Sequence, residues 1–157
     1  MSLNTKQITI NNDFFFQSVE EMLAQGLSVD IKVKGLSMRP FLRHEMDSAR
    51  LVKVSAEELV RGDVVLFRNH GHHTLHRYYG TREGKLIFKG DGNCRLTEQV
   101  GPDDVVARVV SIMRPDGTVT DYGTKDWQRK SRHSLWCKAL RTPIFIAKQT
   151  VKKIIRR

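Results

Sequence analysis

The alternation of hydrophobic and polar residues along the chain predicts a protein built mostly of short β-strands. Val29, Ile31 and Val33 alternate with charged residues, which is the period of a half-buried strand. Similar runs recur downstream, separated by turn-forming Gly, Asn and Asp residues. Strands spaced this closely, with no helices between them, favour an antiparallel, barrel-like or folded-over sheet. The predicted strands span residues 28–34, 49–54, 64–68, 74–79, 85–89, 104–114 and 118–122.

One segment before the first strand has helical periodicity. Residues 13–25 are expected to form a helix, with Asn12 or Asp13 as its N-cap and Gly26 as its C-terminal stop. Residues 14–16 are all phenylalanine, and they are expected to pack in the core or to cover a groove. The helical spacing is carried by Val19, Met22 and Leu23.

A serine follows the first predicted strand at a point where regular structure must break. Gly35 lets the backbone bend, and Pro40 fixes its own φ and disfavours a helical conformation for Arg39. Ser37 therefore lies on a turn, which is a suitable place for a nucleophile. A serine hydroxyl needs a neighbouring base at neutral pH, so the chain must also supply a histidine or a buried lysine.

His76 is the best candidate for that base. It alternates with Leu75 and Arg77 in a predicted strand and shares a face with Tyr78, which would restrict its rotamer. The alternative is a hydrogen-bonded histidine with a purely structural role. Asp91 lies in a Gly-Asp-Gly-Asn turn, from which it could orient the imidazole, and the alternative is a carboxylate that only stabilises its own turn.

Composition limits the cofactors and the number of domains. A chain of 157 residues, 39% hydrophobic, is long enough for one globular domain and an appendage. No cofactor is expected, and no designed metal site, because the neighbouring histidines have no matching carboxylate or cysteine pair. Two cysteines form no pattern and are expected to be free thiols in a reducing compartment. The histidines are His70, His72 and His73, and the cysteines are Cys94 and Cys137.

The positive charge is concentrated at the C-terminal end. Residues 125–157 hold eleven lysines and arginines and a single acid, Asp126, so the whole formal net charge of +10 lies there. The first 124 residues hold sixteen bases and sixteen acids, so the basic character belongs to the tail, and no nucleic-acid partner is expected. A helix beginning at Thr142-Pro143 would carry an apolar stripe among the bases. That stripe would lie on an anionic membrane surface, or pack on the domain or on a partner.

Five short motifs, in this order along residues 30–113, resemble the motifs of the signal peptidase I superfamily, which also contains the self-cleaving SOS-type repressors. The resemblance implies a coiled, mostly antiparallel β-structure with an open apolar groove. It also implies that Ser37 is the nucleophile, that His76 is the base, as in the endoplasmic-reticulum and archaeal branch, and that Asp91 is the family's aspartate. The motifs are Gly35-x-Ser37-Met38-x-Pro40, residues 61–67, Leu75-His76-Arg77, residues 88–93 and residues 104–110.

The chain departs from the family pattern near the nucleophile and at its N-terminus. Gly35 replaces a hydroxyl residue, so main-chain N–H groups of Gly35, Ser37 and Met38 would have to bind the oxyanion. The aspartates that follow the Gly-Asp motif in the endoplasmic-reticulum branch are missing, which leaves Asp91 as the acid. No apolar run of about 18 residues and no secretory signal is found. The expected location is the cytoplasm, with peripheral contact to a membrane.

These observations lead to a hypothesis with three parts. Residues 1–27 form an arm and a helix, residues 28–123 form a signal-peptidase-like catalytic β-domain, and residues 124–157 form a basic amphipathic tail. The expected function is a serine endopeptidase that cleaves an extended leader, signal or precursor peptide. The alternative is a catalytically inactive peptide-binding or regulatory module of the same fold, tethered to a membrane by its tail.

Overall fold

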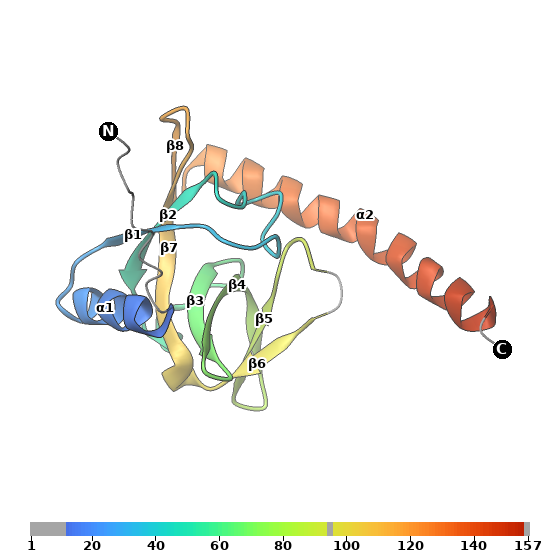
Figure 1. Ribbon diagram of the computed structural model, residues 1–157, viewed down its shortest axis with the longest axis horizontal. Helices are drawn as coiled ribbons and strands as arrows, with labels where there is room; N and C mark the ends of the chain where they lie inside the picture. The colour runs from blue at the N-terminus through green and yellow to red at the C-terminus, as the bar shows by residue number, and fades with distance from the viewer. Residues whose placement is uncertain (1–11, 94–95, 156–157) are drawn as a thin grey trace, which may run out of the picture.

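The computed structural model describes residues 12–93 and 96–155, with side chains described from residue 14 to residue 143 of these ranges (Figure 1). Each of the seven predicted strands corresponds to an observed one, and β6 is an additional, three-residue strand too short to show alternation. Two short 3-10 helices, Ala56–Glu58 and Pro102–Asp104, precede β3 and β7. The main elements are α1 (Asn12–Ala24), β1 (Val29–Lys32), β2 (Ser48–Lys53), β3 (Val64–Asn69), β4 (His72–Arg82), β5 (Lys85–Lys89), β6 (Glu98–Val100), β7 (Val105–Met113), β8 (Val119–Asp121) and α2 (Lys125–Ile155).

The strands form one antiparallel sheet that curls into a half-barrel (Figure 1). The strand order is β1-β2-β7-β3-β4-β5-β6, with β8 paired to β7. Strand β7 therefore separates two parts: β1 and β2 on one side, and the meander from β3 to β6 on the other. Among the described strands, β1 and β6 are the two end strands of the sheet. The prediction of a mainly β, antiparallel, folded-over sheet is confirmed.

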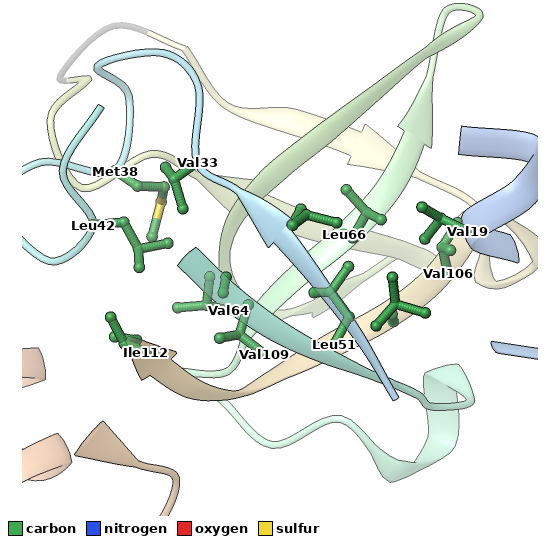
Figure 2. Packing of buried hydrophobic residues seen from close by; sticks show 14 of the residues in the cluster. Val19, Val33, Met38, Leu42, Leu51, Val64, Leu66, Val106, Val109 and Ile112 are labelled. Atoms are coloured by element: carbon green, nitrogen blue, oxygen red, sulfur yellow. The ribbon is translucent and has the colours of Figure 1, made fainter. Parts of the chain in front are cut away.

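Strand β3 shows why the sheet curls. Its residues Val64 and Leu66 are buried in the main hydrophobic cluster, and Val65 and Phe67, on the other face, are buried in a second cluster. Successive side chains of a strand point to opposite faces, so both faces of β3 must be covered. Figure 2 shows the main cluster, with Val19 of α1 towards one end of it and Met38 and Leu42 towards the other.

Helix α1 covers part of the main cluster. Val19 and Leu23, one helical turn apart, are buried against it, and Phe16 packs beside them. Gly26 follows the helix with a φ of 79°, the left-handed conformation that ends many helices. The two other phenylalanines of the run, Phe14 and Phe15, are exposed. The prediction that these phenylalanines pack in the core is therefore confirmed for Phe16 but not for Phe14 or Phe15.

Helix α2 differs from the helix that the sequence predicts. It begins at Lys125 and continues to Ile155, with Pro143 inside it, so the prediction of a helix that starts at Thr142-Pro143 is wrong. The first turn is fixed by Trp127, whose ring is buried against Phe41 and Tyr122. Packing on the domain therefore starts the helix much earlier than the proline suggests. Within the described ranges, neither helix has a segment both long and apolar enough to cross a membrane.

Candidate functional site

Ser37 lies in the turn between β1 and β2, and it is partly exposed. Gly35 has a φ of 93°, a conformation that residues with a side chain rarely adopt. The turn is anchored to the main cluster by three side chains that follow the serine, and these are Met38, Phe41 and Leu42. Because its neighbours are held in the core, the turn fixes Ser37 at a partly exposed position.

Gly90, in the turn after β5, brings Ser37 and His76 to one place. A Cβ atom added at Gly90 would lie 2.5 Å from the main-chain oxygen of Ser37 and 3.0 Å from Nε2 of His76. The amide of Gly92 donates a hydrogen bond of 2.7 Å to the same oxygen of Ser37. Ser37 and the Nε2 edge of His76 therefore both lie against the backbone of Gly90, and a larger residue there would displace one of them.

The curl of the sheet makes this meeting possible. The turn of Ser37 follows β1, at one end of the strand order, and the turn of Gly90 and Gly92 connects β5 and β6, at the other end. In a flat sheet the two ends would be separated by five intervening strands, at roughly 4.8 Å a step. The half-barrel closes that separation, so the candidate site lies where the two ends of the sheet approach each other.

The acid that contacts His76 is Glu98, the first residue of β6. Its Oε2 lies 2.9 Å from Nδ1 of His76, and both side chains are nearly buried. A carboxylate accepts hydrogen bonds, so in the neutral imidazole this contact places the ring proton on Nδ1 and the lone pair on Nε2. Nε2 is the atom that faces the backbone of Gly90, which also contacts the main-chain oxygen of Ser37.

Asp91 has a different partner from the one that the sequence suggests. Its two carboxylate oxygens accept hydrogen bonds of 2.8 and 2.6 Å from Arg77, and Ser134 of α2 donates a third, of 2.7 Å. All three side chains are buried. His76 and Arg77 are consecutive in β4 and point to opposite faces. The expectation that Asp91 orients His76 is therefore corrected: Asp91 binds Arg77, and Glu98 binds His76.

Helix α2 is attached directly to the turns of the candidate site. Ser131 accepts a hydrogen bond of 2.6 Å from Arg77, and Ser134 binds Asp91 as described above. Lys138 donates a hydrogen bond of 2.7 Å to the carbonyl oxygen of Gly90. These three residues are spaced by three and four positions and therefore share one face of the helix. The first half of the basic tail thus packs on the domain.

The main-chain N–H groups expected to bind the oxyanion differ in whether they already donate a hydrogen bond. The N–H of Gly35 already donates a hydrogen bond of 2.9 Å to Nδ1 of His44. For the N–H groups of Ser37 and Met38, the structure records no acceptor among the described residues. Of the three amides named for the oxyanion, only that of Gly35 is therefore already bonded within the described residues.

Sequence reasoning missed Glu98, Ser134 and Lys138. Successive side chains of β4 point to opposite faces, so His76 and Arg77 need different carboxylates as partners. Glu98 is the next acid along the chain after Asp91, and these two features together indicate it. No sequence signal connects Ser134 or Lys138 to residues some forty to fifty positions earlier, since that contact depends on how α2 docks.

The other histidines of β4 do not join this site. His73 pairs with Glu20 of α1 at 2.7 Å, and its ring stacks on Phe16 with centroids 4.2 Å apart. His70 and His72 are exposed in and beside the turn before β4. In the part of the chain that the structure describes, no three His, Cys, Asp or Glu side chains are grouped to hold a metal ion.

Comparison with known proteins does not assign the chain to a family. No protein-family model matches it, and no curated protein matches it.

Proposed function

We propose that the protein is a serine endopeptidase of the signal peptidase I type, acting through Ser37, His76 and Glu98. The observation that carries this proposal is the position of His76, with Nδ1 bonded to Glu98 and Nε2 against the backbone that also touches Ser37. The five sequence motifs that resemble the superfamily support it. So does the curled antiparallel sheet, which agrees with the coiled β-structure that the resemblance implies.

The chemistry follows from the protonation of His76. The Ser37 hydroxyl attacks the carbonyl carbon of the substrate peptide bond while Nε2 takes the hydroxyl proton. When the C–N bond breaks, His76 gives this proton to the leaving amine, and an ester remains on Ser37. Water then attacks the ester, and His76 passes a proton from the water to the serine oxygen, which releases the acid product. Glu98 stabilises the charged imidazole and keeps its ring in position.

An extended peptide is the substrate that best suits this position. Strands β1 and β6 are the end strands of the described sheet. Ser37 follows β1 in the chain, and Glu98 is the first residue of β6. A peptide strand can pair with the edge of an end strand through main-chain hydrogen bonds while its side chains contact the turn of Ser37. A leader or precursor peptide that is extended around its cleavage site would meet this requirement.

The second candidate is a peptide-binding module of the same fold without catalytic activity. Gly35 favours it, because this residue has no hydroxyl and its N–H is already bonded to His44. Such a module would bind extended peptides but would leave Ser37 unreactive.

Mass spectrometry of a peptide library after incubation with the protein separates these two functions. The wild type is expected to generate new termini and to react with a fluorophosphonate at Ser37, and Ser37→Ala and His76→Ala are expected to lose both activities. His73→Ala is the matched control, since His73 is also a β4 histidine paired with a glutamate, and it should retain them. Peptide binding without cleavage or labelling in the wild type would reject the peptidase and favour the binding module.

A further inference from the structure

Helix α2 has two faces that differ in their contacts. Trp127, Ser131, Ser134 and Lys138, spaced by three or four positions, contact the domain. The opposite side, called here the outer face, is exposed to solvent. It comprises Arg129, Arg132, His133, Trp136 and Leu140, again at helical spacing. Arg129 binds Asp126 and His133 contacts Cys137, both within the helix. Beyond α2, no described residue makes a hydrogen bond, ion pair or ring contact with the outer face.

The outer face exposes large apolar side chains. Trp136 is 62% exposed and Leu140 is 49% exposed, four positions apart on the same side of the helix. In the sequence, Ile144, Ala147, Val151 and Ile154 continue this spacing, and the helical backbone is unbroken to Ile155. An apolar stripe that continues along a helix, instead of a single exposed residue, indicates a binding surface.

The charge around this stripe indicates what binds there. Residues 125–157 carry eleven basic residues and one acid. Two copies of the helix that met through their outer faces would bring these charges together, which opposes self-association. An apolar stripe with a tryptophan, flanked by lysines and arginines, is instead typical of helices that lie in the interface of an anionic membrane.

We propose that the outer face of α2 binds the surface of an anionic phospholipid membrane, with Trp136 and Leu140 inserted at the level of the headgroups. In Figure 1, the C-terminal half of α2 projects beyond the sheet, so this part of the helix can lie on a surface without displacing the domain. Lys138, on the docked face, would keep its bond to Gly90 in the bound state. The candidate site would then be held close to the membrane. This inference does not depend on the proposed catalytic activity.

Tryptophan fluorescence of the full chain tests the proposal directly. Trp127 is only 5% exposed, so an emission shift on binding reports on Trp136. We expect a blue shift and co-sedimentation with vesicles of phosphatidylcholine and phosphatidylglycerol, and neither with phosphatidylcholine alone. Added salt should weaken binding, because surface charges are screened. Trp136→Phe should abolish the shift but not the co-sedimentation.

Three sets of variants make the test specific. Trp136→Ser with Leu140→Ser should weaken binding by about tenfold or more, from the loss of apolar area. Arg132→Gln, at an exposed position of the outer face, should weaken it about fivefold. Val119→Ser, which changes an exposed apolar residue on β8, should have no effect.

Two results would overturn the proposal. One is an absence of binding to the anionic vesicles, whether or not the chain binds RNA or another protein. The other is a concentration-dependent dimer that protects Trp136 from a soluble quencher in the absence of lipid. Because none of these measurements uses peptide cleavage, they are independent of the test of the peptidase.

Discussion

His76 and Arg77 are neighbours in strand β4, but each pairs with a different acid and in different surroundings. Arg77 holds Asp91 through two hydrogen bonds inside the protein, and Ser131 and Ser134 of α2 complete that network. His76 holds Glu98 through one contact, close to the partly exposed Ser37. The same strand thus supports a structural ion pair on one face and a candidate catalytic pair on the other. Substitutions on the two faces should therefore have different consequences.

The largest expected effect is on stability, at Asp91. Asp91→Ala would leave Arg77 charged and buried without its partner, which costs about 3–5 kcal/mol. Asp30→Ala is the control, since Asp30 also binds an arginine, Arg50, through two hydrogen bonds but on the surface. Its expected cost is about 0–1 kcal/mol. Urea unfolding measures both, and similar losses in the two variants would mean that the Arg77–Asp91 pair has no special structural role.

The next effect is on catalysis, at Glu98. Glu98→Gln should leave the fold intact and lower kcat by about 10²-fold with little change in KM, because the charged imidazole loses its stabilising carboxylate. Glu98→Asp should restore part of the rate, and Glu20→Gln, which alters the His73–Glu20 pair, should leave it unchanged. If cleavage by the folded protein depended on Asp91 and not on Glu98, the division of roles between the two faces would be wrong.

A smaller effect tests the contact of Ser37 and His76 with the backbone of Gly90. Gly90→Ala should force apart Ser37 and His76, with a strain of about 1–3 kcal/mol and slower labelling of Ser37 by a fluorophosphonate. Gly101→Ala is the matched control, because the nearest atom to its added Cβ would be 3.5 Å away, an ordinary contact. Equal labelling rates in the two variants would show that Gly90 does not set the distance between serine and histidine.

The smallest effect concerns a carboxylate at the surface. Hydrogen bonds from Lys130 and then from Thr120 lower the pKa of Asp126 from 3.8 to about 2. A lowered pKa in the folded state stabilises the protein above pH 3.8, and this contribution is lost as the pH falls through about 2. The Tm of Asp126→Asn should therefore lie slightly below that of the wild type near neutral pH and meet it in strong acid. A difference that persists below pH 2 would point to a cause other than the charge.

Strands and their order of appearance could be predicted from local pattern, because alternation at positions such as Val29, Ile31 and Val33 depends only on which face is buried. The same local information located Ser37 on a turn and His76 in a strand. It failed at β6, which is three residues long, and at the start of α2, where Trp127 packs on residues distant in sequence. Pro143 therefore lies inside a helix that the local pattern predicts to begin there.

Local pattern alone predicts the mainly β character of the chain, the serine and histidine of the candidate site and the concentration of positive charge in residues 125–157. The acid that contacts His76, the contact of α2 with Gly90 and the exposed side of α2 depend on the three-dimensional fold. Alternation reflects only which face of a few neighbouring residues is buried. The contacts of Glu98 with His76 and of Lys138 with Gly90 depend instead on the curl of the sheet and the docking of the helix. Both bring together segments that are far apart in the chain.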